Sequence, residues 1–332
     1  MTLDKVAISI GDPAGIGPEI ALKAALDPRV AAICRPLLVG DRQVIEQHAR
    51  LAGIAAALRA FPAAASVDWS AGGVLVLDPG GLVAGPVAIG TIAAAHGRAA
   101  VEAARLAIAA ALAGAVDAVV AAPQTERAIK EAGIVFDGYP SFLARCAGVA
   151  EEDVFLMHCF DDKRIVHATL HVGLARVIEL ITRERVGRVI AAADSTLRRL
   201  AIARPRLAVA GLNPHAGEEG LFGDEELRII GPAIAAAQAA GIRAEGPFGA
   251  DTMFHRPDYD AFIVMFHDQG HIAAKLLAPN RIAGLAIGTP VLFSSVAHGS
   301  ALDIAGTGRA SHEAVVEAVR RLVGGPRRQA AA

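Results

Sequence analysis

Short apolar, β-branched runs alternate with longer alanine-rich stretches along most of this chain. Seven runs are typical of buried strands: residues 6–10, 35–40, 73–78, 117–123, 164–171, 206–212 and 260–266. Helical spacing of apolar residues marks four stretches between them: residues 17–26, 93–114, 174–200 and 225–241. This alternation predicts βαβ units around a largely parallel or mixed sheet, and therefore an α/β fold.

Length and composition fit two such domains. The chain has 332 residues, of which 54% are hydrophobic and 20% charged, so its apolar content is sufficient for sizeable cores. The sequence contains neither a Pro/Ser-rich linker nor a repeat of fixed period. We therefore expect two α/β domains joined by crossing strands or helices, with the active site in the cleft between them.

Charge and apolar patterning argue against several classes of protein. The formal net charge is -2 and no basic block occurs, which argues against a nucleic-acid partner. The longest helical apolar stretch, between Arg105 and Asp117, is too short to span a bilayer, and the first residues are typical of a strand rather than a signal peptide. Three cysteines without a close pair fit a reducing, cytoplasmic setting.

Two glycine-rich segments are candidates for nucleotide chemistry. Residues 11–19, GDPAGIGPE, follow the first strand, but their spacing is neither that of a dinucleotide fingerprint nor that of a P-loop. A tight turn with Pro18 at the helix start is one interpretation. The other is that the segment resembles GDGIGPE of the decarboxylating isopropylmalate and isocitrate dehydrogenases, with Pro and Ala inserted.

The second segment, HGSALDIAGTGRAS at residues 298–311, is similar to the adenosine-binding loop of the same dehydrogenases. Small residues let the backbone approach a nucleotide closely, and the carboxylate of Asp303 can accept hydrogen bonds from a ribose but would repel a 2′-phosphate. We therefore assign Gly299, Ser300, Asp303 and Gly306 to the binding of NAD rather than NADP. A glycine-rich surface turn is the alternative interpretation.

Three of the eleven histidines follow apolar strands in polar surroundings: His171, His215 and His267. Imidazoles suit zinc and similar divalent ions, and three protein ligands with one open position are the usual catalytic arrangement. The spacing forms no local metal-binding signature, so a shared ion is a hypothesis at this point.

His167 competes with His171 for the same role. Residues four apart in a strand lie about 13 Å apart, so the two cannot ligate one ion. His171, nearer the carboxyl end of the expected strand, is the better ligand, and we expect His167 to be a packed core histidine. We expect His271 to lie around the site or on the surface.

These segments, together with LNPHAGE, ADT and HDQG…K, resemble the 4-hydroxythreonine-4-phosphate dehydrogenase family over nearly the whole chain. The resemblance implies the isocitrate/isopropylmalate dehydrogenase-like fold and an obligate homodimer. It also implies that His171, His215 and His267 bind a divalent metal (zinc first, with Mg, Co, Mn or Fe as alternatives), one of them across the dimer interface. Lys275 and Asp251 would be the catalytic residues; whether Lys275 transfers a proton or only anchors a carboxylate stays open.

On this basis we assign residues 1–125 with 285–332 to a discontinuous NAD-binding domain. Residues 126–284 would form the domain that holds the metal and makes the dimer. The active site would lie between the two domains.

The sequence departs from the family at the phosphate end of the site. Tyr139-Pro140 stands where the family has His-Thr, and Gly284 and Phe293 align with an asparagine and an arginine. Neither Tyr nor Phe can replace an arginine fork, which binds a phosphate bidentately. These changes argue against a phosphomonoester substrate.

Five segments resemble the terephthalate cis-dihydrodiol dehydrogenase branch of the family instead: GYPS, VFLM, RIVHATLH, KLLAPN and SSVAHGSALDIAG. That branch oxidises 1,2-dihydroxy-3,5-cyclohexadiene-1,4-dicarboxylate to protocatechuate with loss of carbon dioxide. Tyr139, Lys275 and Phe293 would bind such a substrate, an acidic diol with a flat apolar ring. The two aromatic residues could equally serve core packing.

Two alternative activities stay open for this chain. One is that of the 4-hydroxythreonine-4-phosphate dehydrogenase of pyridoxal phosphate biosynthesis, and the other is that of a related dehydrogenase of another hydroxy acid. A phosphate acyltransferase of similar fold should lack both the three histidines and the adenosine loop. A catalytically silent binding protein is disfavoured by the metal trio together with Lys275 and Asp251.

Overall fold

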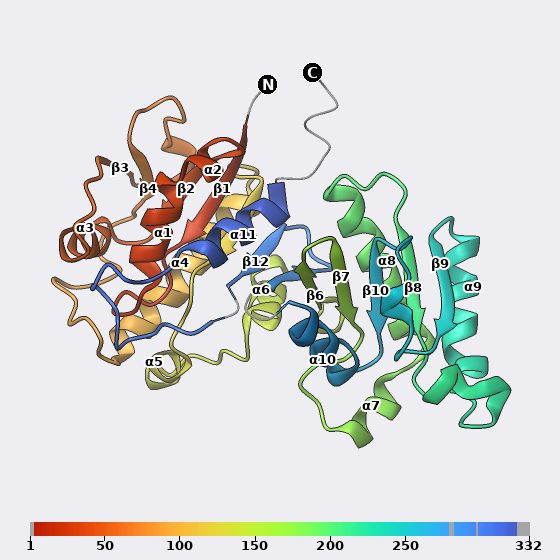
Figure 1. Cartoon of the computed structure of the whole chain (residues 1–332). Helices are drawn as coiled ribbons and strands as arrows, with labels where there is room; N and C mark the ends of the chain where they lie inside the picture. Colours follow the sequence, from red (N-terminus) through yellow and green to blue (C-terminus); the bar gives the residue numbers. More distant parts are fainter. Residues whose placement is uncertain (1–2, 279–281, 297, 324–332) are drawn as a thin grey trace. The chain divides into compact units, whose positions relative to one another are not determined.

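The computed structural model describes residues 3–278, 282–296 and 298–323 (Figure 1). The last two residues of the KLLAPN segment, 279–280, lie outside these ranges. The chain forms two compact units. Unit 1 comprises the described residues up to Gly148 and those from Pro290 onward, and unit 2 comprises Val149–Thr289. Both units are α/β, as the alternating pattern predicts.

The strands of unit 1 run parallel to one another in the order β3-β4-β2-β1-β5-β12. They are β1 (Asp4–Ser9), β2 (Cys34–Val39), β3 (Leu58–Phe61), β4 (Val74–Leu77), β5 (Ala118–Ala121) and β12 (Phe293–Ser295). β4 and β5 are buried throughout, as are most residues of β1. Continuous burial explains why these strands are unbroken apolar runs.

The helices of unit 1 are α1 (Gly17–Leu26), α2 (Pro28–Ala31), α3 (Arg42–Leu51), α4 (Ala94–Leu112), α5 (Glu126–Glu131), α6 (Tyr139–Ala147) and α11 (Glu313–Val323), with a short turn η1 (Ala64–Ser66). The alanine-rich α4 is long because alanine has the highest helix propensity. α5 packs tightly on α4: a Cβ added to Gly97 would lie 2.3 Å from the carbonyl oxygen of Ala128.

Residues 126–148 belong to unit 1, whereas the sequence predicts them in the second domain. Residues 285–289 belong to unit 2, because β11 (Ala283–Ile287) pairs with β6 (Phe155–Phe160). The observed divisions therefore fall at 148/149 and 289/290 instead of 125/126 and 284/285.

Unit 2 contains a mixed sheet in the order β11-β6-β7-β10-β8-β9. Its other strands are β7 (Lys163–His167), β8 (Arg206–Ala210), β9 (Arg243–Phe248) and β10 (Ala261–Val264). β6 is antiparallel to both of its neighbours, and β7, β10, β8 and β9 are parallel. The parallel strands therefore end at one edge of the sheet.

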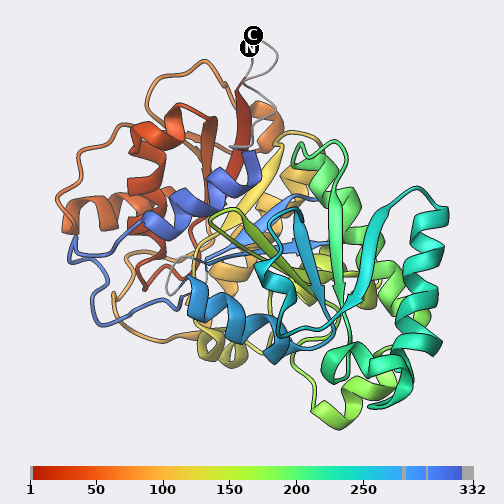
Figure 2. The ribbon, with the colours of Figure 1, turned by 45° about the vertical axis from the view of Figure 1, so that its right-hand side comes forward.

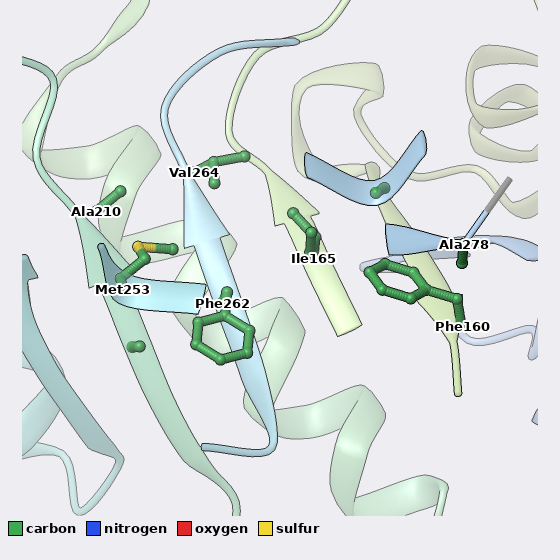
Figure 3. Packing of buried hydrophobic residues seen from close by; sticks show 9 residues of the cluster. Phe160, Ile165, Ala210, Met253, Phe262, Val264 and Ala278 are labelled. Carbon is green, nitrogen blue, oxygen red and sulfur yellow. The ribbon is translucent and has the colours of Figure 1, made fainter. Parts of the chain in front are cut away.

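The helices of unit 2 are α7 (Leu174–Leu180), α8 (Arg183–Arg199), α9 (Gly231–Ala239) and α10 (His267–Leu277), with short turns η2 (Glu151–Asp153), η3 (Pro214–Gly220) and η5 (Met253–His255) and a π-helix η4 (Glu226–Ile230). Helix α9 lies beside the edge strand β9 (Figures 1 and 2). Phe160, Ile165 and Phe262 of the sheet form a core cluster (Figure 3). Ala274 of α10 and Ala278, which directly follows α10, belong to the same cluster.

Two expected elements end early. The strand predicted over 164–171 stops at His167, so His171 lies in the loop before α7. The helix predicted over 174–200 is two helices, because Ile181 is extended and Thr182 caps α8 by accepting a hydrogen bond from the Arg185 amide at 3.2 Å. Within the described ranges, the model contains no helix with the length and hydropathy of a membrane span.

Candidate active site

Three of the parallel strands of unit 2 are followed by the predicted metal ligands, of which His171 and His215 lie in connecting segments and His267 begins α10. His171 follows β7, His267 follows β10 and His215 follows β8, and these strands are neighbours in the order β7-β10-β8. Thr169 ties the first two loops together, because its amide and its hydroxyl both donate to the carbonyl oxygen of Met265, at 3.1 and 2.8 Å. Strand ends at one sheet edge are where α/β proteins bind ligands.

His171 and His267 face each other across a pocket. Their ring centroids are 5.6 Å apart, and the pocket is lined by both rings together with Val172, Leu174 and Phe266. Asp268 orients His267 by accepting a hydrogen bond from its Nδ1 at 2.6 Å. Because Nδ1 of His267 is the donor, its Nε2 carries the lone pair that a metal ion could use, as in histidines that a neighbouring carboxylate supports.

His215 does not join this pair within one chain. The described residues contain two clusters of potential metal ligands within 4.8 Å of one another, and neither includes His171, His215 or His267. The His215 side chain is 64% exposed, and its Nδ1 lies 3.3 Å from Glu218. Within the described residues of one chain, the three predicted metal ligands therefore do not meet at one point.

The backbone around His215 is strained and held from behind. Five consecutive residues, 215–219, have positive φ between 44° and 81°, although only one is glycine. The buried carboxylate of Glu226, at the start of the π-helix, accepts the amides of Leu212 and Asn213 at 2.7 and 2.8 Å. Strained segments persist only where their surroundings fix them, so Glu226 is a positioning residue for His215.

Gln269 connects the His267 and His215 loops. Its Oε1 accepts a hydrogen bond from the Met265 amide at 2.8 Å, and its Nε2 donates to the Gly211 carbonyl oxygen at 3.0 Å. This glutamine belongs to the HDQG motif, but the sequence pattern alone assigns it no role. Sequence reasoning also missed Glu226, because no local pattern links a carboxylate to a loop more than ten residues earlier.

The two predicted catalytic residues are exposed in unit 2. Lys275 follows His267 and His271 along α10 at intervals of eight and four residues, so the three lie on one stripe of the helix. Asp251 lies beside Gly249, where a Cβ would be 2.8 Å from the Asp251 Oδ1 atom and 3.9 Å from the His215 Cα atom. Asp251 therefore neighbours the His215 loop.

A second group of histidines lies behind the first. His158 in β6, His167 in β7 and His271 in α10 have ring centroids 4.3 to 5.1 Å apart, and His271 also stacks on His267 at 3.6 Å. His167 is 1% exposed, so it is a core histidine as expected, and His271 lies around the site. Burial, followed by the charges of His271, His267 and Lys275, lowers the pKa of His158 to about 3.

The predicted cofactor loop in unit 1 packs on the first glycine-rich segment. Ser300 is buried, accepts a hydrogen bond from the Thr125 hydroxyl at 2.9 Å, and comes so close to Gly15 that a Cβ there would lie 2.7 Å from the Ser300 Cβ. Gly306 has φ of +71°, a left-handed conformation that favours glycine.

One side of this loop is open. Nothing lies within 4 Å of the position that a Cβ of Gly299 would occupy, and the Asp303 carboxylate is exposed. The buried Glu19 of the first segment fixes the end of the loop by accepting the amides of Gly308 and Ala310, at 3.3 and 3.1 Å. The segment GDPAGIGPE is therefore more than a turn, because its last residue supports the predicted cofactor loop.

The two aromatic residues assigned to the substrate pack on each other. The Tyr139 and Phe293 ring centroids are 5.0 Å apart, and the Tyr139 hydroxyl donates to the Ala122 carbonyl oxygen at 3.2 Å and accepts a hydrogen bond from the Gln124 side-chain amide. Phe293 is 1% exposed. In this conformation Phe293 supports Tyr139 from within the core, which is the packing role that the sequence leaves open as the alternative to substrate binding.

An α/β fold with a predicted nucleotide-binding loop, histidines at strand ends and a neighbouring lysine is the arrangement expected of a metal- and NAD-dependent dehydrogenase. Comparison with known proteins gives the family. The sequence matches the family described as pyridoxal phosphate biosynthetic protein PdxA over residues 32–322. This chain belongs to that family and is a dehydrogenase; members of the family use NAD and a divalent metal.

Three relatives illustrate the range of the family. A protein of Symbiobacterium thermophilum named "Putative D-threonate 4-phosphate dehydrogenase" is 43% identical over 318 residues, which are 95% of this chain and 94% of that protein. The structure of a terephthalate 1,2-cis-dihydrodiol dehydrogenase from Burkholderia xenovorans is 42% identical, with a TM-score of 0.77 over 97% of this chain and 99% of that chain. A 4-hydroxythreonine-4-phosphate dehydrogenase from Burkholderia phymatum is 35% identical, with a TM-score of 0.88 over 97% and 99%.

Proposed function

We propose that this dehydrogenase converts a carboxylated cyclic cis-diol, 1,2-dihydroxy-3,5-cyclohexadiene-1,4-dicarboxylate, to protocatechuate. The substrate gives up a hydride to NAD, a proton and carbon dioxide. The observation that carries the proposal is the Tyr139–Phe293 ring pair at 5.0 Å, where the phosphate-handling enzymes have a histidine and an arginine. The proposal also draws on the 42% identity to the terephthalate dihydrodiol dehydrogenase.

The chain offers little to a phosphate at these positions. The Tyr139 hydroxyl is engaged with Gln124 and Ala122, Pro140 has no amide hydrogen, and Gly284 has no side chain. A phosphate dianion without paired donors is strongly disfavoured in a partly dry site. An apolar ring with two carboxylates needs fewer donors, and Lys275 can serve one of its carboxylates.

We assign the metal to His171, His215 and His267, with the set completed by a second copy of the chain. The segments that follow these three histidines in the chain expose nine large apolar side chains: Val172, Leu174, Ile178, Leu221, Phe222, Leu227, Ile272, Leu276 and Leu277. Exposed apolar side chains on that scale are typical of an interface between protein chains. A homodimer would cover them and bring the third histidine to the pocket between the other two.

The chemistry that the bound groups supply is polarisation of the diol oxygens by the metal and acceptance of the hydride by NAD. Asp268 keeps His267 in the tautomer that ligates through Nε2. Lys275 binds a substrate carboxylate or moves a proton at its Nζ atom. Asp251, beside the His215 loop, would orient the reacting hydroxyl, and Asp303 would accept hydrogen bonds from the ribose of NAD.

The second candidate function is oxidation of a phosphorylated hydroxy acid, such as D-threonate 4-phosphate. It is favoured by the 43% identity to the Symbiobacterium protein and disfavoured by Tyr139, Pro140, Gly284 and Phe293.

The experiment is to incubate the purified protein with NAD, zinc and a panel of cis-diols and phosphorylated hydroxy acids, and to follow NADH absorbance together with released carbon dioxide. We expect both signals with the carboxylated cis-diol and neither after removal of metal by a chelator. NADH formation only with the phosphorylated acids would contradict the substrate, and activity that survives metal removal would contradict the metal.

A further inference from the structure

The three histidines behind the proposed catalytic pocket have the properties of a binding site. His158 and His167 come from the antiparallel neighbours β6 and β7, and His271 reaches them from α10. One ligand atom from each ring lies within 4.8 Å of the other two. His158 is 8% and His167 is 1% exposed, so both side chains are buried in the protein and are not part of its solvated surface.

The hydrogen bonds of His167 and His271 show which ring nitrogen of each carries the lone pair. Nδ1 of His167 donates to the Leu156 carbonyl oxygen at 3.3 Å, which leaves a lone pair on Nε2. Nδ1 of His271 donates to the His267 carbonyl oxygen at 3.2 Å, with the same result. Among the residues that the structure describes, buried Nε2 of His167 and buried Nδ1 of His158 have no hydrogen-bond partner.

Gly270 keeps His167 uncovered. A Cβ at this position would lie 2.3 Å from Nε2 of His167, so any larger residue would occupy the space in front of that nitrogen. The other cluster of potential ligands, Asp27, His312 and Glu313, is different, because Arg29 forms ion pairs with both of its carboxylates. Of the two clusters found among the described residues, the histidine cluster is the one that has buried lone pairs and no ion-paired carboxylate.

We propose that His158, His167 and His271 bind a second metal ion, a borderline divalent transition metal such as Zn²⁺ or Co²⁺. Imidazole nitrogen suits these ions, whereas Mg²⁺ and Ca²⁺ require oxygen ligands. Tetrahedral coordination places the ligand nitrogens about 3.4 Å apart, so side-chain rotations bring the rings together by up to about 1.4 Å. Three histidines leave the fourth position for water.

This second ion is distinct from the proposed catalytic one. Its ligands come from one chain, whereas the catalytic set needs a second copy. The stacking of His271 on His267 makes the two ligand sets neighbours on α10. The second ion would fix α10 to β6 and β7, and so hold His267 in place from behind.

The test is a cobalt titration of the untagged full-length protein after removal of bound metal. Cobalt per chain is measured after gel filtration, together with the visible absorption of the bound ion. The variants are His215→Ala, which removes a proposed catalytic ligand, His158→Leu, which removes a ligand of the second site, and the double variant. Met157→Leu, at a fully buried neighbouring position in β6, is the control for packing changes.

We expect two equivalents of cobalt in the wild type and in Met157→Leu, one in each single histidine variant and none in the double variant. Magnesium should not compete for the equivalent that His215→Ala retains. The proposal would be overturned if the wild type bound one equivalent of cobalt, His215→Ala bound none and His158→Leu still bound one. The space among the three rings would then be assigned to a buried water. One equivalent that only His158→Leu loses would support the second site and contradict the proposed catalytic ligands instead.

Discussion

Nε2 of Gln269 donates a hydrogen bond to the carbonyl oxygen of Gly211 at 3.0 Å. Gly211 directly follows β8 and opens the loop that carries His215, whereas Gln269 is the second residue after His267. The same side chain accepts the Met265 amide at 2.8 Å, so one glutamine fixes the ends of two neighbouring strands. The placement of His215 and that of His267, two proposed metal ligands, therefore depend on the same side chain.

Replacing this glutamine tests that dependence. Gln269→Leu keeps most of the side-chain volume but loses both hydrogen bonds, and we expect metal affinity to fall about 10- to 100-fold with a matching loss of kcat/KM. Gln269→Glu keeps the acceptor for the Met265 amide but not the donor to Gly211, so its defect should be intermediate. Unchanged metal affinity in Gln269→Leu would show that the two loops are held independently.

Asp268 should act through His267. We expect Asp268→Asn to weaken metal binding about 10- to 100-fold, because a neutral amide oxygen accepts the Nδ1 hydrogen bond more weakly than a carboxylate and makes Nε2 a poorer ligand. Metal affinity is measured by competition with a chromophoric chelator. Asp224→Asn, which changes an exposed carboxylate paired with Arg228 in the same unit, is the control and should bind metal like the wild type.

Asp303 should select the cofactor. Its exposed carboxylate would repel the 2′-phosphate of NADP, so we expect a higher kcat/KM with NAD than with NADP. Asp303→Ser removes this repulsion, so the ratio of kcat/KM with NAD to kcat/KM with NADP should fall at least about tenfold. A tenfold change requires the loss of only about 1.4 kcal/mol of repulsion. A wild-type preference for NADP would contradict the role of this residue.

Acid should destabilise the metal-free protein through the buried histidines. The pKa of His158 is lowered from 6.5 to about 3, chiefly by burial. As pH falls below 6.5, the unfolded chain takes up a proton at this position and the folded chain does not, so stability declines by up to about 1.4 kcal/mol per pH unit until the folded group titrates. Urea unfolding in a chelator between about pH 7 and pH 5 should therefore show a shallower loss for His158→Leu. Equal slopes would indicate that His158 is protonated in the folded protein.

The periodicity of the sequence predicts the α/β class and most central strands, because buried parallel strands are continuous apolar runs. It places His171 in a strand that ends at His167, since periodicity does not register where strand pairing stops. The cofactor loop is recognisable because its small residues are contiguous. Glu226 and His158 are not, because their roles arise from contacts between distant segments. Tyr139 and Phe293 show the same limit: their sequence positions suggest a substrate pocket, and only packing distinguishes a ring at the surface from one in the core.

The central claim is that the aromatic pair at Tyr139 and Phe293 marks an enzyme for a carboxylated cyclic diol. The direct measurement is kcat/KM with NAD and saturating metal for three substrates: 1,2-dihydroxy-3,5-cyclohexadiene-1,4-dicarboxylate, D-threonate 4-phosphate and 4-hydroxythreonine-4-phosphate. We expect the cyclic diol to exceed both phosphorylated acids by at least about 100-fold, which corresponds to about 2.7 kcal/mol of transition-state discrimination. A higher kcat/KM for either phosphorylated acid would contradict the account.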